Sequence, residues 1–170
     1  MHSRIFELYT NDTIEEKLTE DEVLELVQYV NTSADYVIEQ FNERRKDSIE
    51  WIGQNFGNVL KISTEKEEFI FNKETPSIYF MPKFAQFKKA IKDLDSYVSS
   101  KSVEIMTGPT DLSYKMYILT NLYEEKDGFL ILYEREVMSL DYFIRYIGPS
   151  LLQSDIEITL HFGKVYDYHM

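Results

Sequence analysis

A short apolar run late in the chain constrains the fold more than any other feature. The segment FLILYE, residues 129–134, is almost continuously hydrophobic and directly follows a turn signal, KDG. An apolar run of this length bounded by turn residues is typical of a buried strand. We therefore expect a sheet in which residues 129–134 form a central strand.

Further strands are expected on both sides of this run. RIFELYT alternates, with Phe6 and Leu8 on one parity, and predicts a first strand. The other expected strands are a hairpin of residues 59–63 and 67–72, a short strand at 77–80, and the two closing segments IEITLHF and KVYDYHM, residues 156–162 and 164–170.

Helical spacing of apolar residues predicts the remaining elements. Thr19 and Glu22 form a capping-box pattern before a helix over residues 20–30. NTSADYVIEQF predicts a second helix, with its stripe at Ala34, Val37, Ile38 and Phe41. The other expected helices cover residues 43–56 with Gly57 as the stop, residues 82–98 with Pro82 in the first turn, residues 111–125, and residues 139–147 with Ser139 as the cap and Gly148-Pro149 as the stop.

Length and composition fit one packed domain. The chain has 170 residues, of which 44% are hydrophobic, and such a chain can bury a substantial core. We predict a single α+β domain over residues 1–170, with a mixed or antiparallel sheet and amphipathic helices packed on it. The loop at residues 99–110 is a weak candidate for a domain boundary.

Charge and composition narrow the function classes. The formal net charge of −12 opposes binding to nucleic acid or to an anionic membrane surface. The absence of cysteine excludes disulfides, thiolate catalysis and cysteine-ligated zinc. No apolar segment approaches the roughly 20 residues of a membrane span, and the first residues lack a signal region, so we expect a cytoplasmic protein.

The closing stretch HFGKVYDYHM raises the question of a metal or catalytic site. If the strand runs straight through Gly163, Asp167 and His169 keep the parity of His161. A hairpin with a three-residue loop would place His161 opposite Asp167. A two-residue turn at Gly163-Lys164 would instead put Asp167 and His169 on the apolar face, which is costly unless they are paired.

The leading interpretation of this stretch is an exposed strand face that carries an ordinary His–Asp pair. The alternative is a metal site, or a hydrolase-type enzyme, that uses His161, Asp167, His169 and Glu157, since imidazole and carboxylate groups are common ligands of divalent ions. An oriented histidine would also serve as a general base. We expect no cofactor.

Motifs of the common enzyme classes are absent. The sequence has no GxGxxG, GxxxxGK[ST], HExxH or GxSxG segment. The one tight basic cluster is ERRK, residues 43–46. It could hold an anion, but Arg44 and Arg45 are expected to pair with helix acids such as Glu43 and Asp47.

Several segments resemble a set of small bacterial proteins of unassigned function. They are SRIFELYT, ADYVIEQ followed by RRKDSIEW, GFLILYEREVMSLDYF and the terminal VYDYHM. The resemblance implies a cytoplasmic bacterial protein and carries neither an activity nor a site.

The leading functional hypothesis is a non-enzymatic acidic protein that binds another protein, in an immunity- or antitoxin-like role. Its candidate surface is the acidic segment 12–25 with two tyrosines, and the binding residues we expect are Asp21, Glu22, Glu25, Tyr29 and Tyr36. Acidic groups steer a basic partner, and tyrosine is enriched at interfaces. A third hypothesis, a DNA mimic, is weakened by the lysines between residues 83 and 92.

Overall fold

The chain divides into two compact units in a computed structural model that describes residues 2–11, 18–101, 103, 105, 111–123, 128–153 and 156–169. The sheet unit comprises residues 1–76 and 126–170, and the helical unit comprises residues 77–125. The loop 99–110, proposed above as a boundary, therefore lies inside the helical unit. That the two units form one domain stays a prediction.

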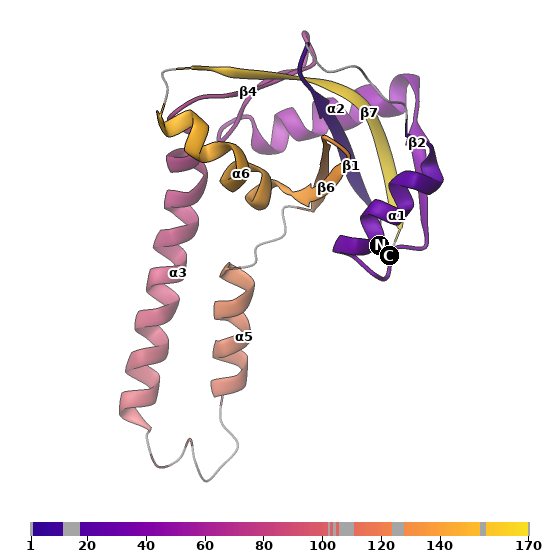
Figure 1. Ribbon diagram of the computed structural model, residues 1–170. Coiled ribbons are helices and arrows are strands. Elements are labelled where there is room, and N and C mark those ends of the chain that lie inside the picture. Colours follow the sequence, from indigo (N-terminus) through magenta and orange to yellow (C-terminus); the bar gives the residue numbers. More distant parts are fainter. Residues whose placement is uncertain are drawn as a thin grey trace. The chain divides into compact units, whose positions relative to one another are not determined.

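The architecture confirms the α+β class (Figure 1). The sheet unit contains β1 (His2–Tyr9), α1 (Glu20–Val30), β2 (Tyr36–Gln40), α2 (Asn42–Phe56), β3 (Lys61–Ser63), β4 (Glu68–Phe71), β5 (Phe129–Tyr133), β6 (Glu136–Ser139), α6 (Leu140–Gln153) and β7 (Ile158–His169). The helical unit contains α5 (Leu112–Tyr123) and all but the first two residues of α3 (Thr75–Ser100).

The seven strands form one mixed sheet. Its order is β3-β4-β7-β1-β5-β6, and β2 pairs with the second part of β7, on the edge where β4 pairs with the first part. The pair β1–β5 is parallel, and the other pairs are antiparallel. Strand β7 is therefore the centre of the sheet and not an exposed last strand.

A bulge interrupts the pairing of β7 with β1. Leu8 lies opposite Phe162, but Phe6 lies opposite Val165, so β7 holds one extra residue between these two pairs. An extra residue of this kind reverses which side chains of the strand point to which face of the sheet. This reversal determines on which face of the sheet His161, Asp167 and His169 lie.

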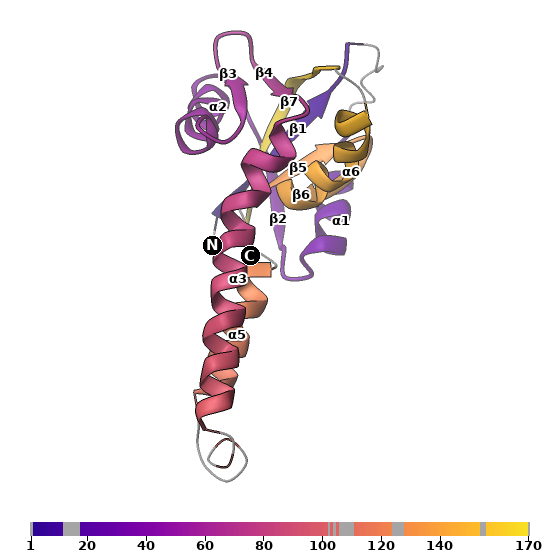
Figure 2. The ribbon, with the colours of Figure 1, turned by 90° about the vertical axis from the view of Figure 1, so that its left-hand side faces the viewer.

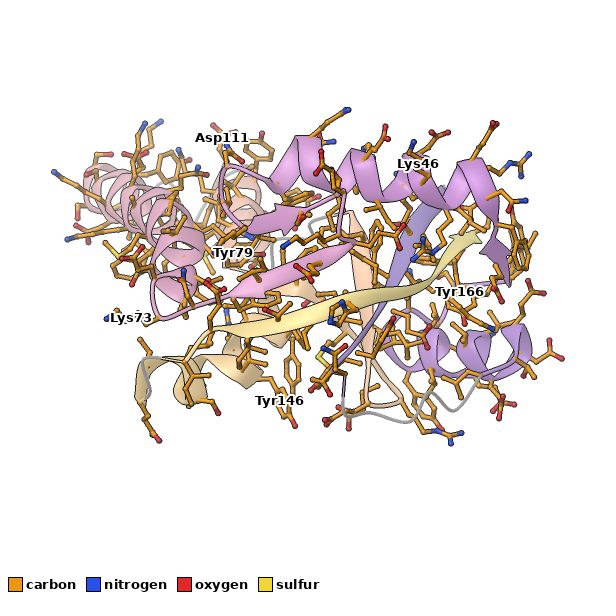
Figure 3. All side chains as sticks on the ribbon, turned by 90° about the horizontal axis from the view of Figure 1, so that it is seen from above. Lys46, Lys73, Tyr79, Asp111, Tyr146 and Tyr166 are labelled. Carbon is orange, nitrogen blue, oxygen red and sulfur yellow. The ribbon has the colours of Figure 1, made fainter. Side chains whose placement is uncertain are left out.

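Helices cover both faces of the sheet. On the face that carries Phe6, Phe129 packs edge-on against Trp51 and Phe56 of α2, and Phe143 of α6 packs against Phe71. The opposite face, which carries Ile5, packs on Val23 and Val27 of α1, as one buried cluster. Helices α1 and α2 accordingly lie on opposite sides of β7 (Figures 2 and 3). Because both faces are covered, Ile5 and Phe6 are both fully buried.

The expected helix at residues 31–41 is wrong. Residues 36–40 form β2 instead, with Val37 6% exposed and Ile38 53% exposed. Tyr, Val and Ile have high strand propensity, and pairing with β7 stabilises the extended backbone. Asn42, at φ 50°, then turns the chain directly into α2, in the left-handed region that asparagine tolerates.

Two expected boundaries at prolines are also wrong. Residues 77–80 do not form a strand, and Pro82 is not in a first turn, because α3 begins earlier, at Thr75. The Asn72 carboxamide oxygen accepts hydrogen bonds from the backbone N–H groups of Glu74 and Thr75, and Pro76 occupies the first turn. Helix α6 likewise continues through Gly148 and Pro149 to Gln153.

Locally specified features are confirmed. The Thr19–Glu22 capping box is present, β3 and β4 form the expected hairpin, and the Ser139 hydroxyl accepts a hydrogen bond from the N–H of Tyr142. Strand β5 is buried inside the sheet between β1 and β6. Helix α2 ends at Gly57 as expected, although Gly57 keeps right-handed helical angles.

Candidate functional site

Four of the five predicted binding residues share the exposed face of α1. Asp21, Glu25 and Tyr29 follow one another at intervals of four residues, and Glu22 lies three residues before Glu25. Residues three and four apart on a helix are neighbours on its surface. All four side chains are exposed, and Tyr29 is 89% exposed. We call Asp21, Glu22, Glu25 and Tyr29 the α1 surface.

Buried side chains and an N-terminal cap fix α1 in place beneath this surface. Val23 and Val27, on the opposite side of the helix, are fully buried against the sheet. At the N-terminus the Glu22 carboxylate accepts hydrogen bonds from the backbone N–H and the hydroxyl of Thr19, at 2.8 and 2.9 Å. The bond from the Thr19 backbone is the main reason that the pKa of Glu22 lies below its ordinary value. Glu22 therefore serves the cap, and Asp21, Glu25 and Tyr29 form the part of the surface open to a partner.

Tyr36, the fifth predicted residue, does not belong to the α1 surface. It begins β2 opposite His169, and the two rings stack with centroids 5.4 Å apart. The register places Tyr36 on the Phe6 face of the sheet, whereas α1 covers the Ile5 face. Tyr36 would lie near the α1 surface only if residues 31–41 formed a helix, and they do not.

The bulge in β7 separates the predicted C-terminal cluster. His161 lies opposite Tyr9, on the Ile5 face, whereas Asp167 lies opposite Arg4 and His169 opposite His2, on the Phe6 face. The chain runs on through Gly163 as one strand, but Asp167 and His169 lie on the face opposite to His161, as they would after a two-residue turn at Gly163-Lys164. The expectation that a straight strand keeps these three residues on one face is wrong, because the bulge interrupts the alternation.

Three members of that cluster each have a different neighbour. His161 Nδ1 lies 4.0 Å from a carboxylate oxygen of Glu68, and the ring of His169 lies 3.1 Å from a carboxylate oxygen of Asp35. Glu157 pairs with Lys61 at 3.0 Å. Across the residues that the structure describes, no group of three His, Asp or Glu side chains is placed to hold a metal ion. The proposed ligand set His161, Asp167, His169 and Glu157 is thus not assembled.

The Arg45 side chain has a role that the sequence did not suggest. Its guanidinium makes a double hydrogen bond to Glu67, at 2.9 and 2.7 Å, and donates to the carbonyl oxygens of Phe162 and Gly163. The hydrogen bond from Arg45 is the main cause that lowers the pKa of Glu67. The expected pairing of Arg45 with acids of its own helix is wrong, because this side chain instead fixes the β7 bulge.

A second polar group lies under α1, around Tyr166. The Lys164 ammonium is 2.8 Å from a carboxylate oxygen of Glu39, and the Lys164 backbone N–H donates to Glu7. Within the described part of the chain, the buried Tyr166 hydroxyl is without a hydrogen-bond partner. Burial, and then the carboxylates around it, raise the pKa of Tyr166. A phenol of raised pKa stays protonated at neutral pH, so this group cannot act as a general base there.

The structure adds an open groove between the end of β2 and the start of α2, with a volume of about 560 Å³. Its lining mixes exposed apolar side chains with charged ones, and includes Ile38, Phe41, Arg44 and Asp167. The helical pattern of residues 31–41 gives no sign of this groove, which forms only where β2 ends and α2 begins. The β-branched and aromatic run YVI was the signal for a strand.

Comparison with protein-family models, with curated proteins and with solved structures found no match. Among the described residues, no helix combines the length and the hydropathy that crossing a bilayer requires.

Proposed function

We propose that this chain is a non-enzymatic protein whose sheet unit binds a basic partner protein through the α1 surface. The observation that carries the proposal is the alignment of Asp21, Glu25 and Tyr29 on one exposed face of a helix that is itself capped and anchored in the core. A rigid helix face loses little conformational freedom on binding. An exposed tyrosine supplies a large contact area, and tyrosines are frequent among residues that dominate binding energy.

The distribution of charge supports a basic partner. Residues 77–125 carry six lysines and six acidic side chains, so the whole net charge of −12 belongs to the sheet unit. Concentrated negative charge accelerates association with a positively charged surface, and salt screens this effect. Binding is therefore expected to weaken steeply as the salt concentration rises.

The test compares proteins captured from an extract of the source organism by the intact chain and by a variant of the α1 surface. The variant combines Asp21→Lys, Glu25→Lys and Tyr29→Ala. Its matched control combines Glu65→Lys, Glu74→Lys and Tyr142→Ala, which change the same charges and remove an exposed tyrosine elsewhere on the sheet unit. Quantitative mass spectrometry at low and high salt gives the readout.

The proposal expects a specific partner whose captured amount falls about tenfold with the α1 variant and stays unchanged with the control. A set of captured proteins that is the same for the intact chain and for both variants would contradict it. Circular dichroism of both variants confirms that a loss of capture does not reflect unfolding, since none of the substituted side chains is buried.

The finer parts of the proposal are a cytoplasmic, bacterial setting and an immunity- or antitoxin-like role, in which an acidic protein neutralises a basic one. The acidic balance of the sheet unit supports the neutralising role, and the resemblance to small bacterial proteins supports the setting. The alternative, a metal protein or hydrolase built on the C-terminal histidines, has no observation in its favour, because the β7 bulge points His161 away from Asp167 and His169.

A further inference from the structure

Helix α3 carries an exposed stripe that no packing within the helical unit explains. The stripe contains three apolar side chains, Phe84, Ile91 and Val98, which are 57%, 45% and 41% exposed, and two exposed charged ones, Lys88 and Asp95. Their spacing alternates between four and three residues, which places all five on one side of a helix. We call these five residues the α3 stripe.

The α3 stripe is separate from the face of α3 that meets α5. Figures 1 and 2 show α5 running beside α3, and the contact is marked by Tyr97, whose hydroxyl accepts a hydrogen bond from the N–H of Asp111. A groove of about 400 Å³ between the two helices is lined by Ala90, Leu94 and Ile118, among others. Helical geometry turns the α3 stripe about a quarter of a turn away from Ala90, Leu94 and Tyr97.

The helical unit buries little apolar surface of its own. Among its described residues only Tyr79 falls in the buried class, whereas the sheet unit holds all the other buried hydrophobic side chains. Most of the stability of a helix in a protein comes from tertiary packing of its apolar face. The exposed apolar side chains of α3 are therefore suited to a further protein surface.

We propose that the α3 stripe pairs with the same stripe of a second copy of this chain, antiparallel, about a two-fold axis at Ile91. Such an axis brings a residue a given distance before Ile91 next to the residue the same distance after it in the other copy. Phe84 and Val98 each lie seven residues from Ile91, so they meet. Lys88 and Asp95 lie three and four residues away, so they meet within one residue, a rise of about 1.5 Å.

This self-complementarity selects a second copy over another partner. A two-fold interface is made from one patch used twice, so its charges must complement themselves when the helix is reversed. The α3 stripe meets that condition, with a cation on one side of Ile91 and an anion on the other. The neutrality of residues 77–125 adds to the argument, since two copies of the helical unit meet without net repulsion.

The experiment measures self-association of the full-length chain by sedimentation velocity across the micromolar range. The intact chain is expected to dimerise.

Lys88→Asp and Asp95→Lys, made singly, each replace two attractive contacts with two repulsive ones, and should weaken dimerisation about tenfold. The double variant, with both substitutions, restores opposite charges and should regain the affinity of the intact chain. Ile91→Lys places two ammonium groups at the axis and should leave the chain monomeric.

Lys89→Asp and Asp93→Lys are the matched controls. They make the same charge changes on α3 but lie outside the α3 stripe, and should leave dimerisation unchanged. A monomeric intact chain would overturn the proposal. So would a dimer in which the single substitutions at residues 88 and 95 behave like the controls, or in which the double variant stays as weak as the singles. Circular dichroism of every variant confirms that α3 is still folded.

Discussion

At the scale of single residues, Arg45 links three parts of the chain. It joins α2 to the turn before β4 through Glu67, and to the β7 bulge through two backbone carbonyl oxygens. Its donors satisfy acceptors that a bulge leaves outside the regular ladder. A lysine could not make the same set of bonds, because its ammonium lacks the planar fork of the guanidinium. The position of this arginine therefore accounts for a bulge that the strand pattern alone did not reveal.

Glu67→Gln should destabilise the protein in a manner that depends on pH. The pairing with Arg45 lowers the pKa of Glu67 below its ordinary value of 4.5. The carboxylate thus contributes stability above pH 4.5, and this contribution is lost as the pH falls through the lowered pKa. Because Glu67 is partly exposed, we expect a loss of about 1 kcal/mol at pH 7. Urea unfolding at several pH values checks this.

In that experiment the difference between Glu67→Gln and the intact chain should shrink as the pH falls from about 4.5. A difference that stays constant down to the acid transition would show that the carboxylate charge is not the cause. Lys46→Gln is a suitable control, since it removes one member of an exposed pair with Glu50 whose atoms are 3.8 Å apart. Its effect should be close to zero.

Tyr166→Phe should leave stability unchanged or increase it by about 1 kcal/mol. The Tyr166 hydroxyl is buried without a hydrogen-bond partner among the described residues, and a buried unsatisfied polar group is costly. Removal of the hydroxyl keeps the ring in its place against α1 and the sheet. Urea unfolding measures the change in the free energy of unfolding. A loss of more than about 1 kcal/mol would mean that the hydroxyl has a partner, such as a buried water.

At the scale of elements, the sequence correctly predicted those helices and strands whose formation depends on residues close together in the chain. The helix at 20–30 was identified by Thr19 and Glu22, which bond to each other, and the strand at 129–133 by its continuous hydrophobicity. The segment 36–40 was assigned wrongly, because Ala34, Val37, Ile38 and Phe41 fit a helical stripe equally well. Its strand conformation depends on pairing with β7, more than 120 residues away. Local patterns carry no information about such a partner.

The effects on stability of substitutions at two adjacent residues of β2 distinguish a strand at residues 36–40 from the helix that the sequence predicted there. In the strand Val37 faces the α1 core and Ile38 faces outward, whereas the helical stripe would bury both. Val37→Thr should cost about 1–3 kcal/mol because it buries a hydroxyl, and Ile38→Thr should stay within about 0.5 kcal/mol. Chemical denaturation of the two variants gives the comparison. Equal losses at both positions would contradict the alternation.

The candidate site was predictable to the same extent as the fold around it. Asp21, Glu22, Glu25 and Tyr29 came together because one correctly predicted helix carries them all. His161, Asp167 and His169 did not, since their placement depends on the one-residue bulge between Phe162 and Val165. A single inserted residue exchanges the two faces of a strand. The sequence of one strand does not show whether it holds one residue more than the strand opposite.

At the scale of the whole molecule, charge and core are both concentrated in one unit. The sheet unit holds the net charge of −12 and all the buried hydrophobic side chains among the described residues except Tyr79, whereas the helical unit is neutral. A core of its own stabilises the sheet unit, whereas a pair of helices with little buried apolar surface depends more on what covers it. This contrast supports the two proposals, partner binding through the sheet unit and self-association through the helical unit.

The two units should therefore differ in how hydrogen exchange responds to protein concentration. On dilution below the dissociation constant of the dimer, the amides of residues 84–98 in α3 should exchange faster, because the α3 stripe loses the surface that stabilises its helix. The exchange rates of the amides of β1, β5 and β7 should not change, since their core lies within one chain.

Exchange measured by mass spectrometry on the intact chain and on Ile91→Lys tests this. In Ile91→Lys the exchange should be fast at every concentration. Protection of residues 84–98 that persists in a monomer would mean that α3 is stable alone, and self-association would then not be needed to fold it.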